Sequence, residues 1–140
     1  MEKKQLKMTF VDTAFVIAWV NENDALHAKA IQLLNDYKDA PWLTTDCILL
    51  EIGNSLARNF QDEAVETINN FLQSEEIEVI TLNQNLFKRA FALYQTYRDK
   101  TWGLIDCVSF IVMQESNLTD ALTNDKHFQQ AGFNALMRED

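Results

Sequence analysis

Four acidic residues interrupt apolar stretches of this sequence, and they are the residues best placed to do chemistry. They are Asp12, Glu51, Asp106 and Asp125. A carboxylate inside an apolar segment is costly unless it is paired or binds a metal. The chain has twelve lysine and arginine residues against twenty-one acidic ones, so we do not expect local ion pairing to neutralise these four.

Each of the four acids also has an ordinary structural explanation. Asp12 and Asp125 could cap the helices that we predict just after them, because a carboxylate accepts from the free N–H groups of a first turn. Asp106 could be a first-turn acid favoured by the helix dipole, and Glu51 could point to solvent from an amphipathic helix. One shared site accounts for all four acids at once.

A shared site of this kind calls for a cation. Carboxylates in one crevice repel one another, so without a cation their pKa values rise as coupled titrations. Mg²⁺ or Mn²⁺ binds through carboxylates, waters and substrate phosphate. Such an ion lowers the pKa of bound water, orients that water and stabilises charge on a leaving oxygen. This is the chemistry of metal-assisted phosphodiester hydrolysis.

The elements that must position these acids alternate between short strands and helices. We predict strands at 8–11, 42–45, 78–82, 121–123 and 134–137, and helices at 14–20, from Asp24 to Pro41, from Asp46, from Asp62, after Asn83, and at 103–115 and 126–131. This order is typical of an α/β fold with a parallel sheet covered by helices on both faces. Ligands of such sheets bind at the carboxyl ends of the strands, where Asp12 and Asp125 would lie.

The helix interpretation also predicts which side chains face inward. In the helix from Asp62 we expect a buried stripe of Val65, Ile68, Phe71 and Leu72. In the helix after Asn83 we expect a second stripe, which consists of Leu86, Phe87, Ala90, Leu93, Tyr94 and Tyr97. Both stripes follow the spacing of one helix face.

Composition narrows the class of protein. The chain has 140 residues, 47% of them hydrophobic, with three glycines and one proline, which indicates one ordinary globular domain. No apolar run approaches the ~20 residues of a membrane span, and we expect no signal peptide, because no small-residue cleavage site follows the charged amino terminus. Cys47 and Cys107 are 60 positions apart, a spacing that suggests reduced, buried thiols in a cytosolic protein.

The net charge of −9 excludes a long-range basic footprint for nucleic acid. A bound metal or a basic partner would have to supply the positive field. Lys88, Arg89, Arg98 and Lys100 form a local basic cluster that could guide RNA or pair with a partner's acids, or could simply be a solvated helix end.

The order and context of the four acids resemble the PIN-domain family, and within it the VapC-type toxin ribonucleases of type II toxin–antitoxin systems. The matching segments are Phe10-Val11-Asp12-Thr13, Leu50-Glu51-Ile52, Ile105-Asp106-Cys107-Val108-Ser109-Phe110, and Leu122-Thr123-Asn124-Asp125-Lys126-His127-Phe128 followed by Ala131-Gly132-Phe133. Successive acids are separated by 39, 55 and 19 positions. The last segment is the most specific of the four.

The resemblance implies a three-layer α/β/α sandwich with a short parallel central sheet, forming a single PIN domain over residues 1–140. It implies a cytoplasmic endoribonuclease dependent on Mg²⁺ or Mn²⁺, with Asp12, Glu51, Asp106 and Asp125 as catalytic and metal-binding residues. It also implies a homodimer that a cognate antitoxin inhibits. Family members differ in whether the fourth acid binds metal directly.

Threonines and a histidine near the acids could contribute to the site, and three other functions compete with the ribonuclease. Thr13 or Thr123 could hydrogen-bond an acid or a metal-bound water. His127 could approach phosphate, but we interpret it as an exposed first-turn histidine. The chain could instead be a non-catalytic PIN-like module that binds RNA or protein. A phosphatase of the haloacid dehalogenase type would have a second aspartate two positions after the first, where this chain has Ala14. A receiver domain would need paired acids at the first strand end, which we cannot place.

Overall fold

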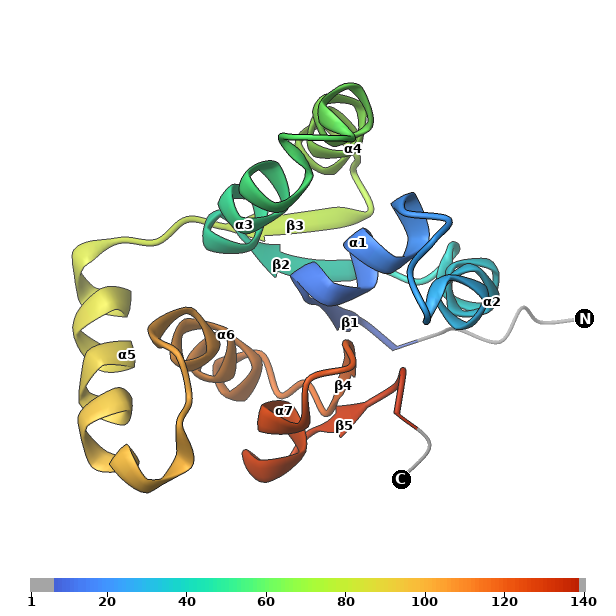
Figure 1. Ribbon diagram of the computed structural model, residues 1–140. Helices are drawn as coiled ribbons and strands as arrows, with labels where there is room; N and C mark the ends of the chain where they lie inside the picture. Colours follow the sequence, from blue (N-terminus) through green and yellow to red (C-terminus); the bar gives the residue numbers. More distant parts are fainter. Residues whose placement is uncertain (1–6, 139–140) are drawn as a thin grey trace, which may run out of the picture.

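The computed structural model describes residues 7–138, and in it short strands alternate with helices along the chain (Figure 1). The elements are β1 (Thr9–Val11), α1 (Thr13–Val20), α2 (His27–Tyr37), β2 (Trp42–Thr45), α3 (Asp46–Leu56), α4 (Gln61–Gln73), β3 (Ile77–Ile80), α5 (Gln84–Thr96), the 3-10 helix η1 (Arg98–Lys100), α6 (Leu104–Glu115), β4 (Asp120–Leu122), α7 (Lys126–Gln130) and β5 (Asn134–Ala135). The signal-peptide prediction used charged residues that lie outside the described part of the chain, namely Glu2, Lys3 and Lys4.

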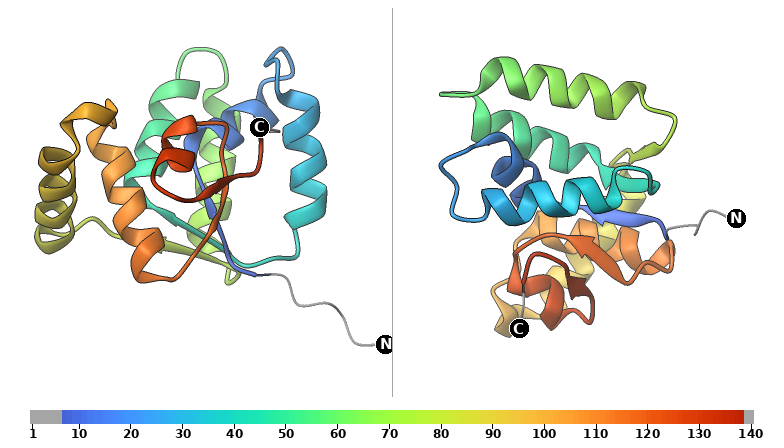
Figure 2. Two further views of the ribbon diagram at one scale, coloured as in Figure 1. Left: turned by 90° about the horizontal axis from the view of Figure 1, so that it is seen from below. Right: turned by 90° about the vertical axis from the view of Figure 1, so that its right-hand side faces the viewer.

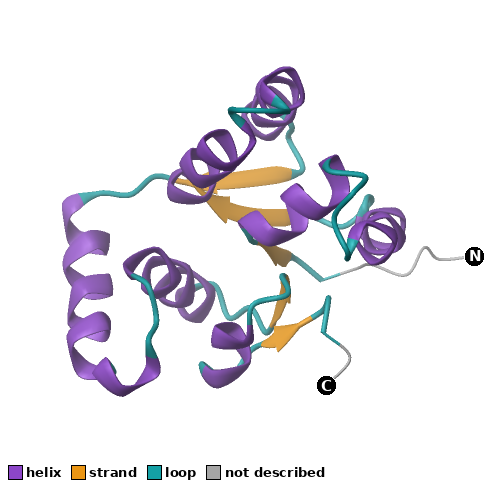
Figure 3. Cartoon of the chain, in the orientation of Figure 1, coloured by secondary structure: helices purple, strands orange, loops and turns teal. Residues whose placement is uncertain are grey.

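The five strands form one parallel sheet in the order β3-β2-β1-β4-β5. Helices α1 to α4 lie to one side of the sheet and α5 to α7 to the other (Figure 2, right), and the strands occupy the centre (Figure 3). Right-handed crossovers explain the two layers, because the chain moves outward from β1 to β3 and then returns across the sheet to β4 and β5. The predicted three-layer α/β/α fold with a parallel central sheet is confirmed.

Strand β1 lies at the centre of the sheet and of the core. Phe10 pairs with Leu43 of β2 on one side and with Ala121 of β4 on the other. Phe10 and Val11 are fully buried, and Phe10 packs against Phe128 with ring centroids 6.1 Å apart. The order in which the chain adds strands reverses between β1 and β4, and in open α/β sheets that switch point is where ligands bind.

Local hydrogen bonds explain several helix starts. Asn83 accepts a bond from the Leu86 N–H and caps α5, as predicted. At α3 the cap is Thr45, which accepts from the Ile48 N–H. Asp46, which we expected to cap this helix, is its first residue and accepts from the Leu82 N–H instead. The Asp46 carboxylate therefore ties α3 to the loop after β3.

The two predicted inward stripes are only partly buried. In α4, Phe71 is buried as expected, but Val65 and Leu72 are exposed, and the buried partners are Ala64 and Thr67. In α5 only Leu86 and Ala90 are buried, because this helix packs mainly on α6 at the edge of the molecule (Figure 1). Phe87, Phe91, Tyr94 and Tyr97, each 42–43% exposed, form what we call the aromatic face of α5. Within the described residues, no helix combines the length and apolar character that a bilayer span requires.

Candidate metal centre

Asp12 follows β1 directly and is held at the switch point of the sheet. Its N–H donates to the Leu122 carbonyl of β4 at 3.2 Å, and its Oδ2 accepts a 2.6 Å hydrogen bond from the Thr123 hydroxyl. Asp12 occupies the N-cap position of α1, but its side chain makes no cap hydrogen bond. The capping explanation for this acid is therefore wrong, and its carboxylate is directed to other partners.

The Asp12 carboxyl is only 8% exposed, and burial raises its pKa from 3.8 to about 7. Hydrogen bonds from Thr123 and from the Thr13 backbone lower that pKa, whereas the charges of Asp106 and Glu51 raise it further. Among the described residues, no lysine, arginine or histidine side chain is among the groups that set the pKa of Asp12. Such a carboxylate gains from a positive ion beside it.

Glu51, on α3, lies close enough to Asp12 for its charge to raise the pKa of that acid. The Thr13 hydroxyl, at the start of α1, donates a 2.9 Å hydrogen bond to its Oε1. Its pKa is raised by burial and then by the charges of Asp106 and Asp125. Glu51 is partly buried and bonded to Thr13, so its carboxylate is not the freely solvated group of the alternative explanation.

Asp106 lies in the first turn of α6, where it combines a local and a long-range role. Its Oδ2 accepts from the Gly103 N–H at 3.1 Å, which closes the amino end of the helix. Burial raises its pKa, and so does the charge of Asp125, while the bond from Gly103 lowers it. Asp106 is therefore a first-turn acid, as the ordinary explanation proposed. It nevertheless also interacts with Asp125.

Asp125 caps α7, because its Oδ1 accepts from the His127 N–H at 2.9 Å. Its own N–H donates to the Thr123 hydroxyl at 3.0 Å. That hydroxyl also donates to Asp12, so Thr123 connects the first acid to the fourth. The prediction that Thr13 or Thr123 hydrogen-bonds an acid is confirmed for both threonines.

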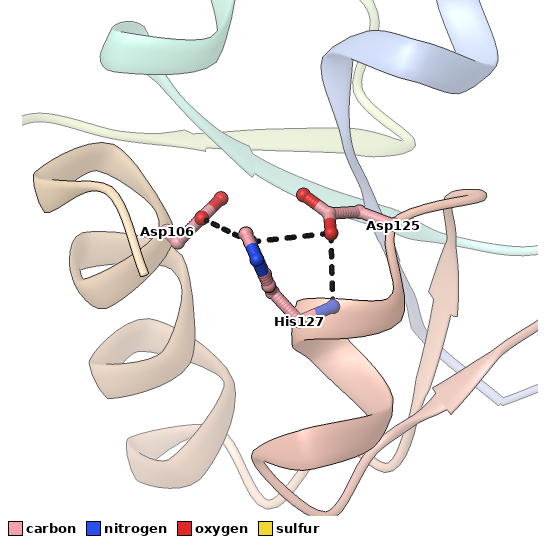
Figure 4. Close-up of side chains that lie close together, drawn as sticks. All are labelled: Asp106, Asp125 and His127. Carbon is pink, nitrogen blue, oxygen red and sulfur yellow. Dashed lines mark hydrogen bonds and ion pairs between the residues drawn. The ribbon is translucent and has the colours of Figure 1, made fainter. Parts of the chain in front are cut away.

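His127 is the residue that the sequence interpretation left outside the group of acids. Its Nδ1 lies 3.1 Å from Asp106 Oδ2 and 3.3 Å from Asp125 Oδ1, and Figure 4 shows the ring beside both carboxylates. Its side chain is only 19% exposed, so the expected exposed histidine is wrong. The sequence feature that could have identified His127 is its position two residues after Asp125, because that spacing places both residues in one tight turn.

The charges that act on each pKa show that the four predicted acids influence one another electrostatically. Asp12 senses Asp106 and Glu51, and Glu51 senses Asp106 and Asp125. One ligand atom from each of Asp106, Asp125 and His127 lies within 4.8 Å of the others, and among the described residues this close group includes neither Asp12 nor Glu51. Carboxylate oxygens in this number suit a hard divalent cation such as Mg²⁺ or Mn²⁺, so the donor set fits the predicted ion.

Other residues singled out in the sequence lie apart from this arrangement. In the basic cluster, Arg89 pairs with Glu115 and Lys100 lies 3.7 Å from Asp99, which favours a solvated helix end. Ser109, one turn after Asp106, is buried, and its hydroxyl has no hydrogen-bond partner among residues 7–138. Cys47 and Cys107 are buried free thiols.

Comparison with known proteins identifies the family and the fold. The sequence model described as PIN domain matches residues 9–134. VapC20 of Mycobacterium tuberculosis, a toxin described as cleaving the sarcin–ricin loop, superposes with a TM-score of 0.80 at 26% identity, over 90% of this chain and 96% of that one. No curated protein sequence matches the chain.

Two further solved structures share the fold at lower identity. A toxin–antitoxin complex from Klebsiella pneumoniae has a TM-score of 0.59 at 17% identity, over 84% of this chain and 87% of that one. VapBC2 from Rickettsia felis, bound to a DNA fragment from its promoter, has a TM-score of 0.61 at 16% identity, over 89% and 92%. Both support the fold alone.

Proposed function

The chain belongs to the PIN-domain family, and from that premise we propose that it is a metal-dependent endoribonuclease, the toxin of a toxin–antitoxin pair. We propose that residues 1–140 form a single PIN domain. The observation that carries the proposal is the buried Asp12 carboxyl at the end of β1, which Thr123 holds by a 2.6 Å hydrogen bond while the charges of Asp106 and Glu51 act on it. A bound divalent ion removes that electrostatic cost.

We assign the four acids to the metal and to catalysis. Asp12, Glu51 and Asp106 hold the ion, and Asp125 assists. Thr123 orients the Asp12 carboxylate, and Thr13 orients Glu51 through hydrogen bonds of 2.6 and 2.9 Å. When bound, Mg²⁺ or Mn²⁺ polarises the phosphodiester and lowers the pKa of a coordinated water. No side chain is assigned as a general base.

RNA is the proposed substrate. The relative with 26% identity is described as a toxin that cleaves the sarcin–ricin loop, which supports an RNA phosphodiester as the target. The net charge of this chain is −9, so the positive field at the scissile phosphate comes from the ion rather than from the surface. An RNA substrate and two free cysteines support a cytoplasmic location.

We propose that the chain forms a homodimer through the aromatic face of α5 and binds a cognate antitoxin. Phe87, Phe91 and Tyr94 stack in a row, with neighbouring ring centroids 6.3 Å apart. Contiguous apolar patches on a soluble chain mark interaction sites, and this one adjoins a groove of about 390 Å³ that Phe91, Tyr94 and Trp102 help to line. A second copy would cover these rings.

The test is cleavage of RNA with Mn²⁺ by the wild-type chain and by Asp12→Asn and Asp106→Asn. We expect both variants to lose at least about a hundredfold in rate, as for removal of electrostatic stabilisation at other sites, with circular dichroism showing an intact fold. Glu66→Gln, on the exposed side of α4, is the matched control and should cleave normally. Normal cleavage by both aspartate variants would refute the proposal.

Calorimetry separates the alternative function. A non-catalytic PIN-like module that binds RNA or protein would bind neither Mg²⁺ nor Mn²⁺ at the four acids. Titration of the wild-type chain with each ion therefore decides between the two functions, independently of which RNA is cut.

A further inference from the structure

The imidazole of His127 is part of the polar lining of the acid site rather than a neighbour of it. Its Nδ1 is 3.1 Å from Asp106 Oδ2 and 3.3 Å from Asp125 Oδ1. Adjacent ligands of an octahedral ion with bonds of about 2.1 Å lie about 3 Å apart. The nitrogen and the two carboxylate oxygens therefore already have the separations of neighbouring ligands around one ion.

The other ring nitrogen has a partner that suits this role. His127 Nε2 lies 3.4 Å from the Thr101 hydroxyl. When Nε2 carries the ring proton and donates it to Thr101, Nδ1 carries a lone pair directed at the two carboxylates. Histidines that bind metals are commonly held in this way, with the remote N–H fixed by a hydrogen bond that sets the tautomer.

The backbone places Thr101 for this contact. Thr101 follows η1 and has φ 56° and ψ 21°, a left-handed conformation that is unfavourable for a β-branched residue. Trp102 comes next; it is buried, and its indole N–H donates to Gln130 of α7 at 2.9 Å. The loop before α6 is thus tied to the helix that carries His127.

We propose, on the basis of the proposed function, that His127 Nδ1 is a direct ligand of the divalent ion together with Asp106 and Asp125. The nitrogen replaces one water of the hydrated ion, while Nε2 keeps the ring proton bonded to Thr101. Imidazole suits first-row transition ions, whereas Mg²⁺ prefers oxygen ligands and keeps its waters. The site therefore selects Mn²⁺ over Mg²⁺ more strongly than four carboxylates would.

The chain offers a clean spectroscopic test, because it contains only two histidines. The second, His27, lies at the start of α2 with its Nδ1 2.8 Å from the Ala18 carbonyl. Pulsed EPR of Mn²⁺ bound to the full chain detects ¹⁴N coupling from a directly bound imidazole. We expect this coupling in the wild type and in His27→Gln, and its loss in His127→Gln.

Calorimetry with Mn²⁺ alone and with Mg²⁺ alone provides the second measurement. We expect His127→Gln to weaken Mn²⁺ binding by about tenfold or more, since even second-sphere changes cost 10–100-fold, and to weaken Mg²⁺ binding much less. Thr101→Val should weaken Mn²⁺ binding while leaving the ¹⁴N coupling present.

The outcomes keep this inference distinct from the proposed function. Bound Mn²⁺ with no ¹⁴N coupling in the wild type would overturn the nitrogen ligand, even if the chain cleaves RNA. Coupling that persists in His127→Gln would overturn it as well. If neither ion binds and no RNA is cut, the proposed function itself fails. The wild-type spectrum decides the matter even if His127→Gln does not fold.

Discussion

The Thr123 hydroxyl donates a 2.6 Å hydrogen bond to Asp12 Oδ2 across 111 positions of sequence. The bond exists because β1 and β4 are neighbours in the sheet, with Val11 beside Leu122. It lowers the pKa of a carboxyl that burial otherwise raises. Thr123 therefore helps to keep Asp12 ionised and ready for a cation.

Replacing Thr123 by valine tests this relationship, because the two side chains have similar shapes. Loss of a hydrogen bond to a charged group is worth about 1.5–3 kcal/mol, so we expect the pKa of Asp12 to rise by about one unit or more. A ¹³C NMR titration of the aspartate carboxyls measures this, with Asp12 assigned from its absence in Asp12→Asn. Thr123→Ser should leave the pKa nearly unchanged, and an unchanged pKa in Thr123→Val would show that the hydroxyl has no such role.

Asp12→Asn should stabilise the metal-free protein at high pH. The pKa of Asp12 is about 7 in the fold against 3.8 ordinarily, so the folded state binds more protons between these values. Its contribution to stability is complete below pH 3.8 and is lost as pH rises through 7. We expect the variant to gain a few kcal/mol over the wild type at pH 8, and much less at pH 4, in urea unfolding. A gain of equal size at both pH values would contradict the burial argument.

Mn²⁺ should stabilise the fold through the same site. A ligand at a hundred times its dissociation constant contributes about 2.7 kcal/mol, which for a domain of this size corresponds to a rise in Tm of roughly 10 °C. The rise should be larger at pH 8 than at pH 5, because protons compete for the raised carboxyls. Thermal unfolding with and without Mn²⁺ measures it, and Asp106→Asn should abolish the rise while Glu66→Gln keeps it.

The aromatic face of α5 should control the oligomeric state. We expect the double variant Phe91→Ser and Tyr94→Ser to be monomeric where the wild type is dimeric, because the exposed rings would no longer bury apolar surface between copies. Light scattering after size-exclusion chromatography measures the mass. Leu72→Ser on α4 is the control, since Leu72 is exposed too but lies away from this face. A wild-type chain that is monomeric at tens of micromolar would contradict the proposed dimer and would indicate that the aromatic face of α5 binds the antitoxin instead.

The two cysteines should react slowly in the folded protein. Burial raises the pKa of Cys47 and raises the pKa of Cys107 to about 11, and the thiolate is the reactive form. A colorimetric thiol reagent at pH 8 should therefore label both residues only as the chain unfolds in urea. Rapid labelling in native buffer would show that one of the two thiols is accessible.

The sequence alone determined the fold class and the four acids. Strands and helices alternate in an order that favours a parallel sheet, and Asp12, Glu51, Asp106 and Asp125 stand out because apolar residues surround each of them. The opening strand and the helix starts at Asn83 and Gly103 could also be read from local patterns, since capping and periodicity depend on residues a few positions apart.

Only the tertiary structure decided what those local patterns leave open. Periodicity places Phe87 and Tyr94 on one stripe, but α5 packs mainly on α6 and leaves both exposed. His127 was misread because its partner Asp106 lies 21 positions away and reaches it only through the packing of α6 against α7. The physical reason is the same in each case. Neighbours in sequence determine which face of a helix a residue occupies. The order of strands in the sheet determines which group covers that residue or bonds to it.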